Sequence, residues 1–228
     1  MRLLIKLSGE AMGGEKREGL DFSAIETLVK RIIDIHNLGN QISVVVGGGN
    51  FMRGRDSKVI ERVNADYIGM MATIMNGLAL TDAFNRLGAK AIFKSGIKME
   101  CFDYASPKDK EEYNKDVIIV YGGGIGKPYY STDTCSAIRA KDLKVDSIIK
   151  LTTIDGVYTD DPKKNKEATK YDKIKFQEVI DNNLGIMDME AIEICKENNI
   201  KIIVTDINNP NSLVDVINNK TTGTIITN

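Results

Sequence analysis

Six short runs of β-branched and aliphatic residues alternate with longer segments of helical periodicity along this chain. The runs cover residues 3–7, 42–46, 90–93, 116–121, 147–151 and 201–205. Strands that alternate with helices in this way form βαβ units, in which the strands run parallel. The sequence therefore predicts an α/β fold with a mainly parallel central sheet sandwiched by helices.

Two of the intervening segments are strongly helical in pattern. Residues 21–39 carry an apolar stripe and end on Gly39, a candidate C-terminal cap. The stripe consists of Ile25, Leu28, Val29, Ile32, Ile33 and Ile35. Residues 66–88 end on Gly88 and are apolar on nearly every side. We expect this second helix to be buried, in the core or at a subunit contact.

The chain reads as one domain over residues 1–228. No linker rich in proline, glycine or serine divides it, and the softest seam is the polar and basic stretch 160–176. We expect an N-terminal lobe of about residues 1–150 and a C-terminal lobe of about 151–228 that completes the sheet. The charged segment 106–115 is expected to be a solvated helix or loop.

Composition and charge argue against several classes of protein. A formal net charge of -1 disfavours a nucleic-acid binder that works by general basicity. The longest apolar runs are shorter than the ~18 residues of a membrane span, so we expect a cytoplasmic protein. His36 is the only histidine, which leaves little for histidine acid-base chemistry. Cys101, Cys135 and Cys195 form no CxxC pair or metal site, and we expect reduced thiols.

Four turns that contain glycine follow apolar strands, at residues 6–14, 44–54, 120–133 and 151–162. The carboxyl ends of parallel strands share one edge of a sheet, so the four turns would form a single site. Glycine permits positive φ and has no Cβ, which allows backbone N–H groups to converge on a phosphate. Any one turn alone could equally be a plain tight turn. Together, they predict a site for a polyphosphate.

Neither of the common nucleotide fingerprints accounts for these turns. The stretch GGGIGKP imitates a P-loop, but Tyr121 stands where the first glycine is required and Pro128 stands where serine or threonine is required. No GxGxxG motif follows a strand. Phosphate binding by another design is therefore expected.

Six stretches resemble, in order and spacing, the motifs of bacterial-type uridylate (UMP) kinases, members of the amino acid kinase superfamily. They read IKLSGEAMGG, VVVGGGNFMRG, DYIGMMATIMNGLAL, GGGIGKPYYSTDT, TTIDGVYTDDP and IMDMEAIEIC. The resemblance covers essentially the whole chain. It implies an amino acid kinase-like fold, and phosphorylation of UMP to UDP by ATP in pyrimidine nucleotide biosynthesis. The N-terminal lobe would bind the acceptor and the C-terminal lobe would bind ATP.

The same resemblance implies partners and regulation. Mg²⁺ would accompany ATP as the cofactor, and ATP and UMP would be the substrates. The chain would assemble into a homohexamer built from dimers. Related enzymes are also regulated by GTP and UTP.

The resemblance assigns roles to individual residues. Contacts to ATP are implied for Lys6, Leu7, Ser8, Gly9, Gly49, Arg53, Thr152, Tyr158 and Asp161. Contacts to UMP are implied for Gly48, Asp66, Ile125, Gly126, Lys127, Pro128, Tyr129, Tyr130, Ser131 and Thr132. The catalytic residues would be Lys6, Arg53 and Asp133, with Lys6 on the transferring phosphoryl group and Asp133 orienting Lys6. Asp66 would accept hydrogen bonds from the ribose hydroxyls.

Phosphoryl transfer fits the residue types independently of the resemblance. The attacking group would be a phosphate oxygen that is already anionic, so alignment and charge neutralisation suffice and no general base is needed. Residues 131–133 open a helix whose free N–H groups would add positive potential. Plainer readings remain for Ser131 or Asp133 as a helix N-cap and for Asp66 as a cap of the long helix. Lys150 is either a second cation near the phosphates or a strand-end lysine.

Three positions depart from the UMP kinase pattern. Ile125 stands where threonine is usual, which removes a hydroxyl; Thr153 replaces a lysine; and Lys127 replaces an asparagine. These changes bear on nucleobase preference more than on phosphoryl transfer.

Two other functions stay open. One is a kinase of the same superfamily that acts on a small carboxylate or carbamate. The other is a non-catalytic nucleotide-binding storage or sensor protein on the same fold. Lys6, Arg53 and Asp133 together argue against the second, because binding alone needs no compensation of transition-state charge.

Overall fold

A computed structural model of the protein describes residues 1–52, 59–109, 113, 117–162, 164–220 and 223–228. Its strands are β1 (Arg2–Leu7), β2 (Gln41–Val46), β3 (Ala91–Ser95), β4 (Asp103–Tyr104), β5 (Ile118–Gly122), β6 (Ser147–Thr152), β7 (Val157–Tyr158), β8 (Lys170–Tyr171), β9 (Lys173–Lys175), β10 (Lys201–Asp206) and β11 (Gly223–Thr227). Its helices are η1 (Gly9–Lys16), α1 (Phe22–Asn37), α2 (Arg62–Arg86), α4 (Thr132–Leu143), α5 (Phe176–Asp181), α6 (Met189–Glu197) and α7 (Ser212–Ile217).

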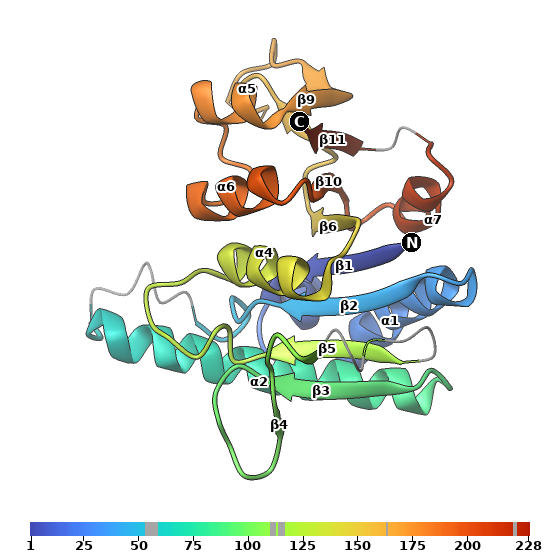
Figure 1. Ribbon diagram of the computed structural model, residues 1–228, viewed down its shortest axis with the longest axis vertical. Coiled ribbons are helices and arrows are strands. Elements are labelled where there is room, and N and C mark those ends of the chain that lie inside the picture. Colours follow the sequence, from blue (N-terminus) through green and yellow to red (C-terminus); the bar gives the residue numbers. More distant parts are fainter. Residues whose placement is uncertain (53–58, 110–112, 114–116, 163, 221–222) are drawn as a thin grey trace.

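Nine strands form one sheet in the order β4-β3-β5-β2-β1-β6-β10-β11-β9, shown in Figure 1. The neighbouring strands in this order are parallel except β10 and β11. Strands β7 and β8 form a separate antiparallel pair. The six predicted strands are present as β1, β2, β3, β5, β6 and β10, and the predicted, mainly parallel sheet is confirmed.

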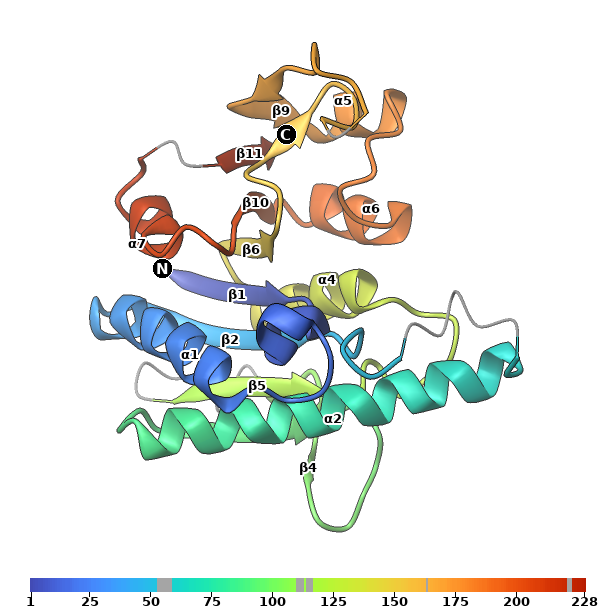
Figure 2. The ribbon, with the colours of Figure 1, turned by 180° about the vertical axis from the view of Figure 1, so that it is seen from behind.

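The sheet separates two apolar cores, and this arrangement follows from the alternation of side chains along each strand. In β1, Leu3 and Ile5 belong to the core shared with α1 and α2, whereas Leu4 belongs to the core shared with α4 and α6. Figures 1 and 2 show these helix layers from the two sides. Because helices cover both faces of the sheet, the central residues of β1 are all apolar and buried, and its lysine, Lys6, lies near its carboxyl end.

Helix α1 forms as its sequence predicts. Asp21 caps it, with one carboxylate oxygen accepting hydrogen bonds from the backbone N–H groups of Ser23 at 3.0 Å and Ala24 at 3.1 Å. Gly39 follows the helix with φ of +83°. Every residue of the predicted stripe is buried except Ile33, which is partly buried.

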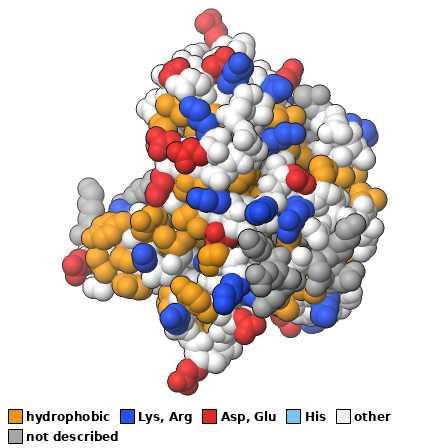
Figure 3. Space-filling model, in the orientation of Figure 1, with side chains coloured by type: hydrophobic (Ala, Val, Ile, Leu, Met, Phe, Trp, Pro, Cys, Tyr) orange, Lys and Arg blue, Asp and Glu red, His pale blue; other side chains and the backbone are white. Residues whose placement is uncertain are grey.

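Helix α2 begins at Arg62, four residues before the predicted start, and within a single chain only one of its sides is buried. Its exposed apolar side chains are Tyr67, Ile68, Met71 and Met75. Figure 3 shows hydrophobic side chains gathered on the surface over the N-terminal part of this helix. The expectation of burial all round is therefore wrong for one chain, and a subunit contact stays a prediction.

The charge of residues 106–115 suggested a solvated segment, but Asp109 within it is buried in the protein. Asp109 is 2% exposed and forms an ion pair of 3.0 Å with Lys94, which is 3% exposed. The hydroxyl of Tyr121 also donates to Asp109, at 3.1 Å. This buried pair joins the segment to β3 and β5, so the charged residue is satisfied by the protein and not by water.

None of the described helices is both long enough and hydrophobic enough to span a lipid bilayer.

Candidate active site

The turns after β1 and β2 meet at the carboxyl edge of the sheet, where packing between backbones explains two of the glycines. A Cβ on Gly9 would lie 2.8 Å from the carbonyl oxygen of Gly47 and would also clash with the backbone nitrogen of Gly49. A Cβ on Gly48 would lie 2.7 Å from the carbonyl oxygen of Gly69 in α2. A Cβ on Gly49 would meet nothing closer than 3.9 Å. The protein's own close contacts therefore require Gly9 and Gly48.

Two buried asparagines hold the second turn against α2. Asn50 and Asn76 exchange hydrogen bonds between their side-chain amides, at 2.9 and 2.8 Å. Asn76 Nδ2 also donates to the Gly47 carbonyl at 2.7 Å, and Asn50 Nδ2 donates to the Gly19 carbonyl at 2.6 Å. The sequence analysis did not predict this pair. The only signal in the sequence is that each asparagine stands next to a glycine, Asn50 in the turn after β2 and Asn76 within α2.

A carboxylate from α4 bridges two lysines at the same edge. Lys6 and Lys150 are direct partners in the parallel register of β1 and β6, so their side chains leave the sheet side by side. Asp133 Oδ1 lies 2.9 Å from Lys6 Nζ, and Asp133 Oδ2 lies 3.1 Å from Lys150 Nζ. Lys150 also donates to the carbonyl of Ile186. Lys150 is therefore a second cation of this cluster.

Mutual electrostatics fix the charge of this cluster. Burial raises the pKa of Asp133, but Lys6 and then Lys150 outweigh burial and hold that pKa below its usual 3.8. The pKa of Lys150 is lowered, first by burial and then by Lys6, although Asp133 opposes both. The three side chains are between 12 and 19% exposed. The carboxylate therefore stays ionised and keeps two cations close together without full exposure to water.

The beginning of α4 is fixed by two caps. Ser131 is the N-cap, and its hydroxyl oxygen accepts from the N–H groups of Asp133 at 3.0 Å and Thr134 at 3.1 Å. Those two N–H groups are thus not free to meet an anion, contrary to expectation. Ser131 in turn donates to Asp188, which caps α6 and accepts from Thr134 Oγ1 at 2.7 Å. Asp188 was not predicted, although it lies in a quoted motif.

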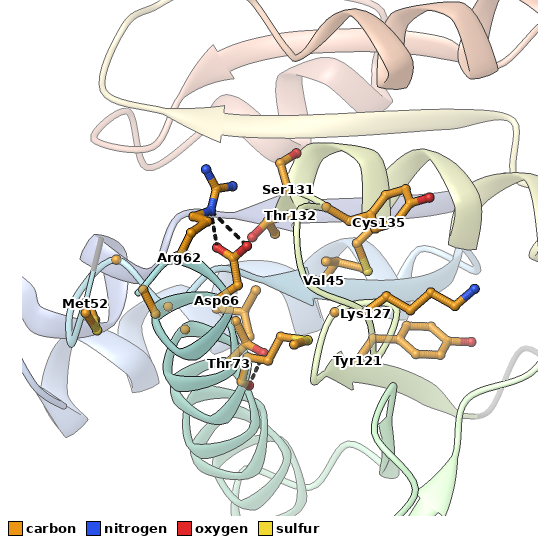
Figure 4. A pocket seen from close by; sticks show the side chains of 18 residues that line it. Val45, Met52, Arg62, Asp66, Thr73, Tyr121, Lys127, Ser131, Thr132 and Cys135 are labelled. Carbon is orange, nitrogen blue, oxygen red and sulfur yellow. Dashed lines mark hydrogen bonds and ion pairs between the residues drawn. The ribbon is translucent and has the colours of Figure 1, made fainter. Parts of the chain in front are cut away.

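A cavity of about 300 Å³, here called the α2 cavity, is lined by Ser131 and Thr132, the two residues that precede Asp133. Figure 4 shows α2, β2 and the turn before α4 contributing side chains to it. Its predicted residues are Gly48, Gly49, Asp66, Lys127, Tyr130, Ser131 and Thr132. Ile125 does not line it but packs against the core shared with α4 and α6.

A second cavity of about 520 Å³, here called the β7 cavity, lies beside Lys150. The predicted residues Thr152, Tyr158 and Asp161 line it. Asn182 and Asn183 also line it and were not predicted, because a polar turn after a short helix carries no distinctive pattern. Each cavity thus adjoins the lysine cluster at one point, because Thr132, which precedes Asp133, lines the first and Lys150 lines the second.

Comparisons with known proteins decide the family. A model described as the amino acid kinase family matches residues 1–206. The chain belongs to the amino acid kinase family. A crystal structure of UMP kinase from Ureaplasma parvum is 37% identical and has a TM-score of 0.94, over 100% of this chain and 99% of that one. The structure of UMP kinase from Bacillus anthracis is 30% identical, with a TM-score of 0.95, over 99 and 95%.

A more distant structure shares the fold of this amino acid kinase. Uridylate kinase from Archaeoglobus fulgidus is 26% identical, with a TM-score of 0.72, over 100% of each chain. The predicted resemblance to UMP kinases is confirmed by the two bacterial structures. The predicted roles of individual residues stay predictions.

Two further predicted residues of this kinase follow Lys6 directly in the chain. Leu7 is fully buried, so only its backbone could meet a ligand, and Ser8 lines a neighbouring cavity together with Thr153. Arg53 lies outside the described residues. Asp66 is in the second turn of α2 and does not cap the helix, which excludes that plainer reading.

We expect Asn76→Ala to lower the free energy of unfolding by about 2 kcal/mol, because it leaves the Gly47 carbonyl and the Asn50 amide without their partner. Asn37→Ala, at an exposed position of α1, is the control and should change it little. Urea denaturation of both variants would measure the difference. Equal stability of the two variants would show that the asparagine pair is dispensable.

The charge of Asp133 gives a pH dependence with a defined sign. Its folded-state pKa lies below 3.8, so its contribution is present above that pH and is lost as the pH falls through the lower folded value. At about pH 7 we expect Asp133→Asn to lose about 3 kcal/mol of stability, because it leaves two close cations uncompensated. The deficit should shrink below pH 3.8, as measured by urea denaturation at several pH values. A deficit independent of pH would contradict the ion-pair account.

Proposed function

We propose that the protein transfers the γ-phosphoryl group of ATP to UMP, giving UDP and ADP, in pyrimidine nucleotide biosynthesis. The observation that carries this proposal is the pair of lysines, Lys6 and Lys150, bridged by Asp133. Lys150 lines one cavity, and Thr132, next to Asp133 in the chain, lines the other. A phosphoryl group in transit carries negative charge at the junction of donor and acceptor, which is where a fixed cation pair stabilises it most. The similarity to UMP kinase structures supports the choice of substrates.

The two cavities divide the substrates between the lobes. UMP occupies the α2 cavity, whose walls include Gly48, Asp66 and part of the turn before α4, namely Lys127, Tyr130, Ser131 and Thr132. ATP occupies the β7 cavity, with Thr152, Tyr158 and Asp161 on its adenosine side. The acceptor lobe is then about residues 1–150 and the donor lobe is about 151–228. The ATP phosphates meet Lys6, Ser8, Gly9 and Gly49, together with Arg53.

The transfer is direct and in line. An oxygen of the UMP phosphate, already anionic, attacks the γ-phosphorus of ATP, and the bond from that phosphorus to the bridging oxygen of ADP breaks. Lys6 neutralises charge on the transferring group, and Asp133 keeps Lys6 and Lys150 aimed at it. No proton is transferred in this step, so no general base is needed. The residues that line the two cavities include no histidine, which is consistent with this mechanism. Alignment and charge are the whole contribution of the protein.

Magnesium enters with ATP. The two lysines and one carboxylate of the cluster have a net charge of +1. The phosphates of two nucleotides carry more negative charge than this, so a divalent cation would supply the missing positive charge. The described part of the chain has no group of three or more metal-ligating side chains, which fits an ion held mainly by phosphate oxygens. The carboxylates of Asp133 and Asp188 already pair with Lys6 and Thr134, respectively. When bound, Mg²⁺ would neutralise charge on the phosphates.

Assembly and regulation follow the resemblance. The exposed apolar side of α2, formed by Tyr67, Ile68, Met71 and Met75, suits a contact between copies of the chain within a homohexamer. Regulation by GTP or UTP and residence in the cytoplasm belong to the same proposal.

A coupled assay of ADP formation with each nucleoside monophosphate tests the function. We expect UMP to give the highest kcat/KM, and small carboxylates or carbamate to give none. Lys6→Ala should lower kcat by about 100-fold or more, because it removes charge that compensates the transition state. Lys30→Ala, an exposed lysine of α1, is the control. Turnover of a carboxylate instead of UMP would establish the runner-up kinase, and nucleotide binding without turnover would establish a storage or sensor protein.

We expect Asp66→Asn to raise the KM for UMP by about tenfold, because it weakens charge-assisted hydrogen bonds to the ribose, and to leave the KM for ATP unchanged. Asp82→Asn, in the other half of the same helix, is the matched control and should change neither value. Initial rates at varied UMP and at varied ATP measure both constants. A rise in the KM for ATP instead would mean that the two cavities are assigned the wrong way round.

A further inference from the structure

Helix α2 carries two ion pairs with the same spacing but the opposite order of charge. Near its C-terminus, Asp82 pairs with Arg86 at 2.7 Å, and both side chains are well exposed, 64 and 46%. Near its N-terminus, Arg62 pairs with Asp66, and Arg62 Nε lies 2.9 Å from each carboxylate oxygen. Asp66 is only 15% exposed. The two pairs offer an internal comparison of what such a pair does for the helix.

The Arg62–Asp66 pair works against the electrostatics of its helix. The N-terminus of a helix carries partial positive charge and favours acidic side chains, and an acidic residue that precedes a basic one by four positions is the better order. Asp82–Arg86 follows both preferences, whereas Arg62 is the first residue of α2 and precedes its acid. Helix stability therefore does not explain why an arginine stands at position 62. Its ion pair with Asp66, which lines the α2 cavity, does explain it.

Asp66 has a third contact, from the turn that borders the same cavity. The backbone N–H of Tyr129 donates to Asp66 Oδ2 at 2.8 Å. Tyr129 has φ of +71°, in the left-handed region that costs a non-glycine residue about 1–2 kcal/mol. The guanidinium carbon of Arg62 lies 5.6 Å from the centre of its ring, within cation–π range. Asp66 and Arg62 together thus hold this turn in a conformation that its sequence alone does not favour.

We propose that Arg62 and Tyr129 act as positioning residues that clasp Asp66 and thereby set the preference of the site for ribose over 2′-deoxyribose. This inference rests on the proposed role of Asp66 toward the ribose. A carboxylate has about four lone-pair sites. The clasp, defined as Arg62, Asp66 and Tyr129, engages both oxygens but leaves capacity for a ligand hydroxyl, in a fixed direction.

Figure 4 shows Arg62 at the start of the helix, with dashed lines from its side chain to both oxygens of the Asp66 carboxylate. In this arrangement Arg62 orients the acceptor of the hydrogen bond, and need not contact the sugar itself. Removal of Arg62 frees the carboxylate to rotate, and also loosens the turn through Tyr129. A fixed acceptor discriminates between a sugar that has the 2′-hydroxyl and one that lacks it, whereas a mobile one discriminates poorly.

The test compares UMP with dUMP as acceptors for four forms of the full-length protein. They are the wild type, Arg62→Met, Asp66→Asn and, as a matched control on the same helix, Arg86→Met. We expect the ratio of kcat/KM for UMP to that for dUMP to fall about tenfold in Arg62→Met, through loss of activity with UMP, with the KM for ATP unchanged. Arg86→Met should keep the wild-type ratio. Thermal unfolding should show Arg62→Met at least as stable as Arg86→Met, because Arg62 opposes the helix dipole.

The outcomes separate this inference from the assignment on which it rests. A wild-type ratio in Arg62→Met with a reduced ratio in Asp66→Asn would overturn the clasp and leave the role of Asp66 in place. An equal loss with UMP and dUMP in Arg62→Met would also overturn the clasp, because Arg62 would then act on the phosphate or the base. Wild-type ratios in both variants would overturn the assignment of Asp66 itself.

Discussion

The repulsion between two neighbouring lysines is the constraint on which the rest of this site depends. The parallel register of β1 and β6 places Lys6 opposite Lys150, and like charges directly opposite one another destabilise a sheet. Asp133 relieves this repulsion only if α4 begins at the right place. The start of α4 is in turn fixed by Ser131 and by Asp188 at the start of α6. A buried pair of cations therefore requires two helices to be aligned at their N-termini.

This requirement links folding to the proposed chemistry. A site that binds two polyanions must carry positive charge before they arrive, and that charge is unfavourable in the unliganded protein. Asp133 lowers the cost by neutralising half of it, while the lysines remain near enough to each other to face one transferring group. The depressed pKa of Lys150 shows that part of the cost remains. Ligand phosphates would relieve that remainder, which is binding free energy available for aligning the substrates.

A feature of the fold or of the candidate site could be predicted from the sequence only where its pattern lies within a short stretch of the chain. The six main strands, helix α1 and the glycine turns were predicted correctly, because each has its pattern within about twenty residues. Two side-chain pairs could not be predicted, Asn50 with Asn76 and Asp109 with Lys94. Each joins residues that come together only in the folded protein. The start of α2 was missed because Arg62 is an unfavourable first residue, and Asp66 looked more like a cap.

The three departures from the UMP kinase pattern differ in whether the residue packs in the core or lines a cavity. Ile125 packs into the core, so its lost hydroxyl is exchanged for apolar burial. Thr153 does not line the β7 cavity but lines another cavity together with Ser8, so the missing lysine takes no charge from the walls of the β7 cavity. Lys127, in contrast, lines the α2 cavity and adds a cation there. Lys127 thus contributes positive charge to the walls of the α2 cavity, while the Asp133 bridge between Lys6 and Lys150 involves none of these three positions.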